Sequence, residues 1–583
     1  MPVHLRSTLH NLVNTVGLVY ANITDDPSFF ALQVVRKFKN PILRRIFRFV
    51  VYTPMSKTRR EILQSVLAED TSRILLVSER WFADTNRKSS DGLALANVCI
   101  ALNQWDPAQR ILDQLGTDRA TARVRARMAW HMGNLHEAVD VLSRNGTSRQ
   151  LRHYDSELQV LSGWKPAIAP QENQAIGRDN QVLYFATNSL PYTGSGYAQR
   201  THSIVASLPQ AGWRASVATR INYPANIGHL LATPRETIDA VTYQRVLSFP
   251  ARTDMKGRLQ QQSDELMNLV TESRPSVLHT TTDFSNAVSV RAVADATGLP
   301  WVYEVRGQLA DTWASTRPDS AQDSERYRLF KAREVEAAQA ADHVVTLGEH
   351  MKLNLVAAGV DEENITVLPN GIGDKFLEAP VPRLSARAKV SLESDAFYIG
   401  TVSSLVPYEG LDTLLETAAL LVPSHPSLRV LIVGDGTERE NLRNLAQELG
   451  IMAICQFPGR VPRDEAHLYH ASLNAFVVPR RDLAVTRSVT PLKPVEALAS
   501  GVPVLASDLP ALGELIRDGE NGHLIKAENI DAWAAAISDL VSHPDQAARM
   551  GRAGRDFVLR TRTWSSNAHR LSKIYENLIS KPS

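Results

Sequence analysis

Charged side chains of both signs gather in the stretch from 477 to 516, around a short apolar segment: Arg480, Arg481, Arg487, Lys493 and Glu496. The pattern predicts an apolar strand, a polar loop, a short helix that begins near Pro491–Pro494, a strand over Val502–Ala506 and another helix. Free N–H groups at a helix N-terminus and nearby cations bind phosphates. A carboxylate such as Glu496 binds sugar hydroxyls. The stretch therefore predicts a nucleotide-sugar site.

The elements that hold this stretch belong to a large chain of ordinary composition. Its 583 residues exceed what one hydrophobic core supports, so we expect three or four domains. With 44% hydrophobic and 22% charged residues it resembles a soluble globular protein. A net charge of +2 argues against a general nucleic-acid binder. Cys99 and Cys455, far apart in sequence, argue against a disulfide framework and for a reducing compartment.

The first sixty residues bear on localisation. No stretch reaches the ~20 apolar residues that span a bilayer. The apolar patch from Leu12 to Ala21 contains Asn14 and has polar flanks, which makes it a poor signal peptide. Between Ala31 and Arg60, nine Lys or Arg residues mix with apolar ones and no acid. We expect a cytoplasmic protein whose segment 31–60 contacts the inner membrane face, the alternative being a helix packed on the protein with solvated charges.

A helical repeat follows from about residue 88 to residue 145. ALNQWDPAQRILDQL (101–115) aligns with HMGNLHEAVDVLSRN (131–145) at an offset of 30 residues. Small Ala108 and Ala138 fall at the predicted helix crossings. The pattern resembles tetratricopeptide-like hairpins, with a period below the usual ~34 residues. Two such units are too few to stand alone, so we expect them to lean on the catalytic part, as a protein-binding surface or as scaffolding.

After a polar, proline-containing linker (166–179), the chain alternates between strand and helix patterns. A strand over Val182–Ala186, a helix over about 197–210 and a strand over Arg214–Thr219 form a βαβ unit. Between strand and helix, Gly194, Ser195 and Gly196 allow a backbone to approach a ligand closely. A merely tight turn is the alternative interpretation of this loop.

Polar side chains end the next two strands, 276–283 and 299–307. His279, Asp283, Glu304 and Arg306 lie at the carboxyl ends, where open α/β sheets bind ligands. His279 could equally be a hydrogen-bonded structural residue, and Arg306 suggests an anionic partner.

The polar run 308–327 predicts a mobile segment over a cleft. A second alternating set begins at Phe397, after a hinge near 372–394, so two parallel-sheet domains should face each other across that cleft.

At this point the chain resembles the family 4 (group 1) retaining glycosyltransferases of the GT-B fold, over about residues 180–580. The motifs that carry the resemblance are NSLPYTGSGYAQRTHSI, ADHVVTLGEHMKLNLVAAGVDEENITVLPNGI, VSSLVPYEGLDTLLE, VLIVGDGTERENLRNLA, FPGRVPRDEAHLYHAS, VEALASGVPVLASDLPALGELI and TWSSNAHRLSKIYENLI. The expected fold is α/β, with two Rossmann-like domains facing a cleft after an all-helical, tetratricopeptide-like region. The expected divisions are a basic segment (1–60), helical repeats (61–165), an acceptor domain (180–375), a donor domain (395–555) and a returning C-terminal helix (556–583).

The resemblance also implies roles for single residues. Glu496 would bind ribose hydroxyls, Arg306 and His279 would line the acceptor side, and these three form the expected catalytic set. The expected donor-binding set is Gly194, Ser195, Gly196, Ser404, Gly434, Arg460, Arg480, Arg481, Ser488, Thr490, Pro491, Leu492, Lys493 and Glu496. No cofactor or metal is expected, because amides and cations neutralise the leaving diphosphate in this family.

The sequence departs from the family pattern in three places. Ser488 replaces the first of two carboxylates, Arg306 replaces a histidine, and Ser404 and Glu409 replace an Arg/Lys phosphate clamp. Glu409 would repel a diphosphate by roughly 4 kcal/mol at ~4 Å and an effective dielectric of ~20. We hypothesise that the clamp has moved to the 480–493 loop, with Thr490-Pro491-Leu492 replacing the phosphate-facing turn; the alternative is that these arginines are solvated.

These observations predict sugar transfer from a nucleotide-diphosphate sugar to a hydroxyl of a glycan or lipid-linked acceptor, with retained anomeric configuration, in cell-envelope or surface polysaccharide synthesis. Expected partners are the donor, the acceptor, a membrane surface through residues 31–60 and a protein through the helical repeats, but no nucleic acid. Two alternatives stay open: a nucleotide-sugar epimerase, and a non-catalytic scaffold with a degenerate donor site.

Overall fold

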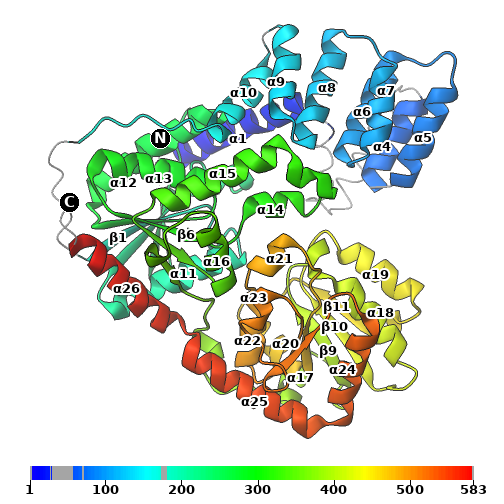
Figure 1. Cartoon of the computed structure of the whole chain (residues 1–583), viewed down its shortest axis with the longest axis vertical. Coiled ribbons are helices and arrows are strands. Elements are labelled where there is room, and N and C mark those ends of the chain that lie inside the picture. Colours follow the sequence, from blue (N-terminus) through cyan, green and yellow to red (C-terminus); the bar gives the residue numbers. More distant parts are fainter. Residues whose placement is uncertain are drawn as a thin grey trace.

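The computed structural model describes residues 3–26, 28, 57–68, 71–146, 148–171 and 180–580. Figure 1 shows a helical region above two α/β domains, with the first domain between the helical region and the second domain. The two parallel-sheet domains and the helical region before them confirm the predicted fold class. No helix in the described ranges is both long and apolar enough to cross a bilayer.

The helical region repeats with the predicted offset. Helix α6 (Ser89–Ala101) is followed 30 residues later by α8 (Arg119–Met132), and α7 (Trp105–Asp113) by α9 (Leu135–Arg144). Ala108 and Ala138, expected at the helix crossings, are fully buried. The other helices of this region are α1 (Val3–Asp25), α4 (Lys57–Ala68), α5 (Thr71–Ala83) and α10 (Arg149–Leu161).

The repeat leans on the first α/β domain, as its small size required. Trp130 and Leu158 share a buried cluster with Leu259 and Phe284 of that domain. Ser156 of α10 donates a hydrogen bond to Asp254, 3.0 Å away. The helical hairpins therefore extend the core of the first α/β domain.

The first α/β domain is built on an eight-stranded sheet in the order β3-β4-β2-β1-β5-β6-β7-β8. All paired strands are parallel except β3 and β4. The strands are β1 (Gln181–Ala186), β2 (Arg214–Thr219), β3 (Arg235–Ile238), β4 (Val241–Arg245), β5 (Val277–Thr281), β6 (Trp301–Val305), β7 (His343–Thr346) and β8 (Ile365–Val367). Strands β5 and β6 are buried along their whole length, because helices cover both faces of the sheet.

The helices of the first domain are α11 (Gly196–Ser207), α12 (Met255–Ser273), α13 (Phe284–Thr297), α14 (Leu309–Ala314), α15 (Glu325–Ala340) and α16 (Glu349–Ala357). Helices α12, α13, α15 and α16 pack on one face of the sheet. Helix α11 packs on the other face together with the last helix of the chain, α26 (Trp564–Ser580).

The second α/β domain holds a six-stranded parallel sheet in the order β11-β10-β9-β12-β13-β14. Its strands are β9 (Phe397–Val402), β10 (Leu428–Val433), β11 (Cys455–Gly459), β12 (Ala475–Val478), β13 (Val504–Ser507) and β14 (Gly522–Ile525). Its helices are α17 (Arg383–Lys389), α18 (Leu411–Leu421), α19 (Arg439–Glu448), α20 (Ala466–Ser472), α21 (Ala484–Ser488), α22 (Lys493–Ala499), α23 (Pro510–Gly513), α24 (Ile530–Ser542) and α25 (Pro544–Thr561).

The chain crosses between the domains twice at one place. Ile372, just after β8, pairs with Thr563, between α25 and α26. A Cβ at Gly371 would lie 3.0 Å from the backbone of Thr563 and Trp564, so the crossing segments touch. Helix α26 then runs along the first domain (Figure 1), where Tyr575 is fully buried. The last helix therefore packs on the first domain, and it begins at Trp564 rather than near residue 556.

Two stretches differ from the expected loops. Residues 308–327, expected as a mobile segment, form α14 and a 3-10 helix (Asp319–Asp323). The polar loop before α22 contains α21. Most of the basic segment 31–60 lies outside the described residues, and α4 begins at Lys57.

Candidate interdomain active site

A cavity of about 580 Å³ lies between the two α/β domains, at the carboxyl end of β6. The first domain lines it with polar groups from the end of β6 and from α14, α15 and α16, and the second domain adds the loop around α21. Its principal polar lining residues are Gln308, Asp311, Tyr327, Lys331, Glu334, His350, Asn354, Arg487 and Ser488. A cleft between the sheets is where the sequence predicted substrate binding.

Within the described residues, three side-chain hydrogen bonds join the domains at or beside this cavity. Asn354 Nδ2 donates to Ser488 Oγ at 2.9 Å, and the His350 N–H donates to Glu514 Oε1 at 2.9 Å. Asn370 Nδ2 donates to the Thr490 carbonyl at 2.9 Å. Ser488, where the family has a carboxylate, is therefore an interdomain contact.

The turn at 490–492 also contacts the first domain. Thr490 is 1% exposed, and its Oγ1 has no hydrogen-bond partner within the described residues. Leu492 packs against the first-domain core, while Pro491 is half-buried. Helix α22 has only seven residues, so its dipole offers less to a phosphate than the sequence suggested. The backbone carbonyl of Thr490 and the side chain of Leu492 thus join the second domain to the first.

Arg480 and Glu409 neutralise each other at the end of two neighbouring strands. Arg480 Nη2 lies 2.7 Å from Glu409 Oε1, and Arg480 Nε lies 3.1 Å from Glu409 Oε2. The two side chains are 7% and 12% exposed. Burial lowers the pKa of Arg480, but the Glu409 carboxylate outweighs it and leaves that pKa above its usual value.

The remaining arginines of the expected clamp are also paired. Arg481 binds Asp412 on α18, and Arg487 binds Asp482 with Nη2 2.7 Å from Oδ2. All three arginines of the 480–493 loop therefore have carboxylate partners in this structure, and the hypothesis of a phosphate clamp relocated to this loop stays a prediction. Arg460 is exposed at the end of β11 and has no ion pair within the described residues.

Glu496 is held between two basic side chains. Lys493 Nζ donates to Glu496 Oε2 at 2.8 Å, and His470 Nε2 lies 3.4 Å from the same oxygen. Burial raises the pKa of Glu496, but the Lys493 charge and the neighbouring His470 bring it down to about 2. Burial also lowers the pKa of His470. Glu496 is therefore an ionised acceptor, able to bind hydroxyls, with 11% of its side chain exposed.

The glycine loop of the first domain is open on its outer side. A Cβ on Gly194 or Gly196 would meet no atom within 4 Å. Ser195 caps α11 by accepting the Ala198 N–H at 3.3 Å. Tyr197, which follows, donates to the Arg306 carbonyl at 3.4 Å. Its hydroxyl would lie 2.6 Å from a Cβ at Gly307, so the loop and the end of β6 form one surface.

Arg306 and His279 lie beneath that surface, each 1% exposed. Arg306 binds Glu304 and the hydroxyl of Tyr184, and His279 Nδ1 lies 2.6 Å from the Tyr575 hydroxyl. The prediction that these two residues line the acceptor side is therefore wrong for the structure. Their positions at strand ends were predicted correctly, but their side chains turn into the core.

Glu304 is the centre of this buried network. Besides Arg306, it binds Arg200 Nε at 2.7 Å, and it lies 3.6 Å from His279 Nε2. Burial raises the pKa of Glu304, but the two guanidinium groups hold it well below its usual range. Burial lowers the pKa of His279, which keeps that imidazole neutral. The network fixes the ends of β5 and β6.

Two further predicted donor contacts have different surroundings. Ser404 is exposed in the loop after β9. Gly434, with φ of 140°, would place a Cβ 1.8 Å from the Ser403 carbonyl. Only glycine fits at position 434, because the ends of two strands pack closely there. This holds whether or not a donor contacts Gly434.

Sequence reasoning missed two polar residues of the site. Asn370, taken for a turn residue, is 5% exposed and links Arg200 to the Thr490 carbonyl. Glu334 of α15 lines the cavity and accepts the Leu309 N–H at 2.7 Å. Burial raises the pKa of Glu334 to about 8. In the sequence, Asn370 looks like an ordinary turn residue and Glu334 like a residue on the exposed surface of a helix.

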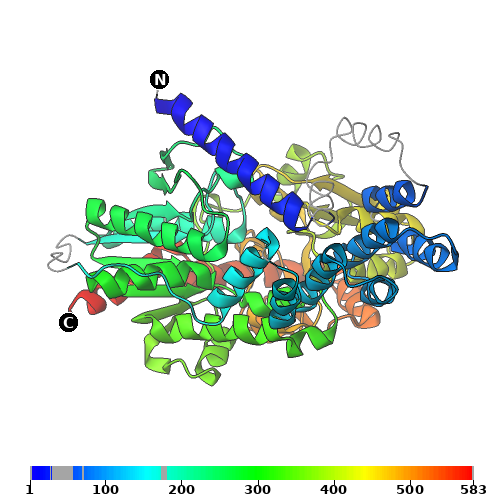
Figure 2. The same ribbon diagram turned by 90° about the horizontal axis from the view of Figure 1, so that it is seen from above.

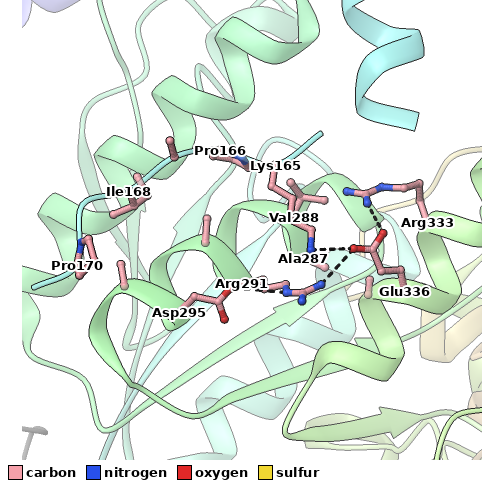
Figure 3. Close-up of a pocket in the computed structure, with 14 residues that line it drawn as sticks. Lys165, Pro166, Ile168, Pro170, Ala287, Val288, Arg291, Asp295, Arg333 and Glu336 are labelled. Carbon is pink, nitrogen blue, oxygen red and sulfur yellow. Dashed lines mark hydrogen bonds and ion pairs between the residues drawn. The ribbon is translucent and has the colours of Figure 1, made fainter. Parts of the chain in front are cut away.

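A second cavity, of about 270 Å³, lies between residues 165–170 and helices α13 and α15 (Figure 3). Glu336 is its polar centre: Lys165 and Arg291 each lie 3.2 Å from its Oε1, and Arg333 also binds it. Its lining comes from the linker and the first domain alone, so it is separate from the interdomain site.

Both α/β domains match known protein families. Residues 383–557 match the family described as glycosyl transferases group 1, and residues 195–371 match the glycosyl transferase 4-like domain. The chain is 30% identical over 237 residues to the GDP-mannose-dependent α-(1-6)-phosphatidylinositol monomannoside mannosyltransferase of Mycolicibacterium smegmatis. That match covers 40% of this chain and 62% of the relative. It is also 30% identical over 272 residues to the D-inositol 3-phosphate glycosyltransferase of Gordonia bronchialis, covering 45% and 57%.

Solved structures show the same fold. Sucrose-phosphate synthase from Thermosynechococcus elongatus has a TM-score of 0.57 at 20% identity, covering 69% of this chain and 99% of that one. HepE from Anabaena, solved with UDP, has a TM-score of 0.53 at 16% identity, covering 68% and 100%. The two α/β domains thus have the GT-B fold, and the matches span between 44% and 62% of the length of these curated relatives.

Proposed function

Because the chain belongs to the group 1 glycosyl transferases, we propose that it moves a sugar from a nucleotide-diphosphate sugar to a hydroxyl of a glycan or lipid-linked acceptor, with retention of the anomeric configuration. The observation that carries the proposal is the cavity of about 580 Å³ between the two sheets, which residues of both domains line. On the second domain, Glu496 is ionised and available to a donor. The family match alone would not locate the reaction in this chain.

The donor binds on the second domain in this proposal. Glu496 accepts hydrogen bonds from the ribose hydroxyls, as its low pKa and its place at the end of the 480–493 loop support. Lys493, with 29% of its side chain exposed, and the exposed Arg460 are the cations within reach of an anionic donor. The loop at Gly194–Gly196, open on its outer side, closes over the diphosphate.

The acceptor and the transferred sugar occupy the interdomain cavity. Gln308, Asp311 and Asn354 offer amide and carboxylate groups that match sugar hydroxyls. Attack of the acceptor hydroxyl occurs on the face that the diphosphate leaves, and a diphosphate oxygen takes the hydroxyl proton. A cavity closed by two domains excludes water, which strengthens each of these electrostatic interactions.

The names of the relatives suggest which donor and acceptor this chain uses. One relative is named as dependent on GDP-mannose with a phosphatidylinositol mannoside acceptor, and another acts on D-inositol 3-phosphate. We propose a lipid or inositol-containing acceptor in cell-envelope synthesis, a guanine or uracil nucleotide donor, and no requirement for a metal. Contact of segment 31–60 with the membrane and of the helical repeats with a protein also remain part of the proposal.

A second function is favoured by one observation. Arg480, Arg481, Arg487 and Lys493 each face a carboxylate, which leaves little free positive charge for a diphosphate. A non-catalytic scaffold with a degenerate donor site would have this charge balance.

The test is nucleotide binding followed by transfer. We expect UDP or GDP to bind in a calorimetric titration, and the purified chain to release that nucleotide from its sugar when a lipid acceptor extract is added. Glu496→Gln should abolish turnover, while Glu448→Gln, on the exposed surface of α19, should not. EDTA should leave the rate unchanged. Absence of nucleotide binding would favour the scaffold, and release of sugar isomers without acceptor would favour an epimerase.

A further inference from the structure

Helix α1 contacts the first α/β domain through polar side chains. Asn11, 2% exposed, donates to the carbonyls of Leu230 at 3.0 Å and Ala232 at 3.2 Å. Asn14 donates to the Ser248 carbonyl at 2.8 Å, and its Oδ1 accepts the Ala251 N–H at 3.0 Å. These bonds to backbone groups fix the rotation of the helix about its axis.

The opposite face of α1 is apolar and exposed. Its members recur at helical spacing and have exposed fractions between 37% and 61%: Leu9, Leu12, Val13, Val16, Val19 and Tyr20. A surface helix in a globular protein normally turns such a stripe inward. Here the amphipathic pattern is inverted, so the stripe has another partner. Figure 2 shows α1 lying along the outside of the molecule, with its N-terminal end projecting.

The apolar surface continues beside the helix. Leu231, between the two carbonyls that bind Asn11, is 80% exposed. Phe249, 45% exposed, stacks on His10 of α1 with ring centroids 4.1 Å apart. We name the stripe with these two residues the α1 face. An exposed patch that extends over three separate segments marks an interaction site.

A cation lies at one end of the α1 face. The sequence of α1 contains one Arg and one Asp, neither among the exposed apolar residues. At the far end of the stripe, Arg149 lies 5.4 Å from the centre of the Tyr20 ring. Soon after α1 the chain enters the acid-free run 31–60, with nine Lys or Arg. An apolar face that ends in an aromatic side chain with a cation over its ring, in a chain whose next segment is basic, matches an anionic lipid surface.

We propose that the α1 face lies in the interfacial layer of a membrane that carries anionic lipids. The six-residue stripe spans about 16 Å along the helix axis, a length suited to lying in the plane of the surface. A stable protein dimer buries about 800 Å² on each partner, around a core with a surrounding polar rim. The α1 face has eight side chains, the six of the stripe with Leu231 and Phe249, whereas a dimer interface takes about 20–30 residues from each partner.

This proposal goes beyond sugar transfer and does not depend on it. It adds a membrane contact on the first domain to the basic segment considered from the sequence. The tilt of α1 is fixed by its hydrogen bonds to that domain. The contact therefore orients the domain that we expect to bind the acceptor.

The experiment is flotation of the full chain with phosphatidylcholine vesicles containing about 30% phosphatidylglycerol. The variant L12S/V16S should lower the bound fraction about tenfold or more, because two buried aliphatic side chains are lost from the lipid phase. Leu420→Ser on α18, at an equally exposed position of the second domain, is the matched control and should bind as the wild type does. Thermal unfolding should be the same for all three proteins.

A label reports the position directly. The native cysteines, Cys99 and Cys455, are buried, so V16C can be coupled selectively to an environment-sensitive fluorophore. Its emission should shift to the blue on anionic vesicles, while the same label at L420C should not shift. Equal flotation of L12S/V16S and wild type, or no shift at position 16, would overturn the proposal. So would a dimer in vesicle-free solution that L12S/V16S abolishes, since a second copy would then cover the face.

Discussion

The ion pair between Arg480 and Glu409 sets the net charge of the proposed donor site. We consider Arg480→Met, Glu409→Gln and the double variant. Both side chains lie near the cleft with little exposure, and two short N–O contacts join them. If the pair acts as a neutral unit, each single substitution leaves one unbalanced charge, and the double substitution leaves none.

The expected magnitudes follow from this geometry. Breaking a buried pair from one side costs about 3–5 kcal/mol of unfolding free energy, and the residual exposure places these variants near the lower end. For a diphosphate about 8 Å from the unbalanced charge, at an effective dielectric of about 20, the interaction is about 2 kcal/mol per unit charge, or about 30-fold in affinity. Arg480→Met should therefore weaken nucleotide binding, and Glu409→Gln should strengthen it.

Two assays separate the effects. Urea unfolding followed by circular dichroism gives the free energy of unfolding, and calorimetry with UDP and GDP gives affinity. The double variant should return close to wild type in both measurements, with a coupling energy of a few kcal/mol. Added salt should reduce the affinity differences between the single variants, because part of the charge faces solvent.

One result would refute this reasoning. If the double variant bound nucleotide as weakly as Arg480→Met, the guanidinium itself would be contacting the phosphates. That outcome would support the relocated clamp, with Glu409 as a partner displaced by the donor.

Three other substitutions test the surroundings of the site. Glu304→Gln should lower the unfolding free energy by about 3–5 kcal/mol, because two buried guanidinium groups lose their carboxylate; a loss below about 1 kcal/mol in urea unfolding would contradict this. Glu334 has a pKa near 8, above its ordinary 4.5, so its contribution to stability is full below pH 4.5 and is lost as pH rises through 8. Glu334→Gln should flatten that part of the stability–pH curve, measured by thermal unfolding. Gly348→Ala would place a Cβ 2.5 Å from Glu514 Oε2, a carboxylate that joins the domains. It should cost about 1–2 kcal/mol and lower kcat/KM in the transfer assay, and unchanged kinetics would show that this contact does not govern closure.

The fold was readable from the sequence because its strands are buried on both faces. Phe397–Val402 and Leu428–Val433 are mostly apolar, interrupted by Thr401 and Arg429, and helices of ordinary length separate such runs. Helices α14 and α21 were missed because they have six and five residues, too few for a helical period to show. Helix α14 is held by Glu334, which accepts its first N–H groups from a distant helix.

The location of the site could be predicted from the sequence, but the pairing of its cations with carboxylates could not. Arg480 and Glu409 are 71 residues apart, and no local pattern joins them. They meet because β12 pairs with β9 in parallel, so the loops that follow these two strands emerge side by side. The same holds for Arg481 and Asp412, from the same two neighbourhoods. Strand order, which a single sequence does not reveal, decides which cations stay free.

The burial of Arg306 has the same origin. A charged residue at a strand end faces the cleft or the core according to what the neighbouring strands place beneath it. Glu304, two residues earlier on the same strand, points to the same side, and Arg200 reaches it from α11. Two cations on one buried carboxylate leave a net positive charge inside the first domain, behind the surface formed by Tyr197 and Gly307. Positive charge at the end of β6 therefore acts on the cleft only through the protein interior, whereas Arg460 is exposed and Lys493 keeps 29% of its side chain exposed.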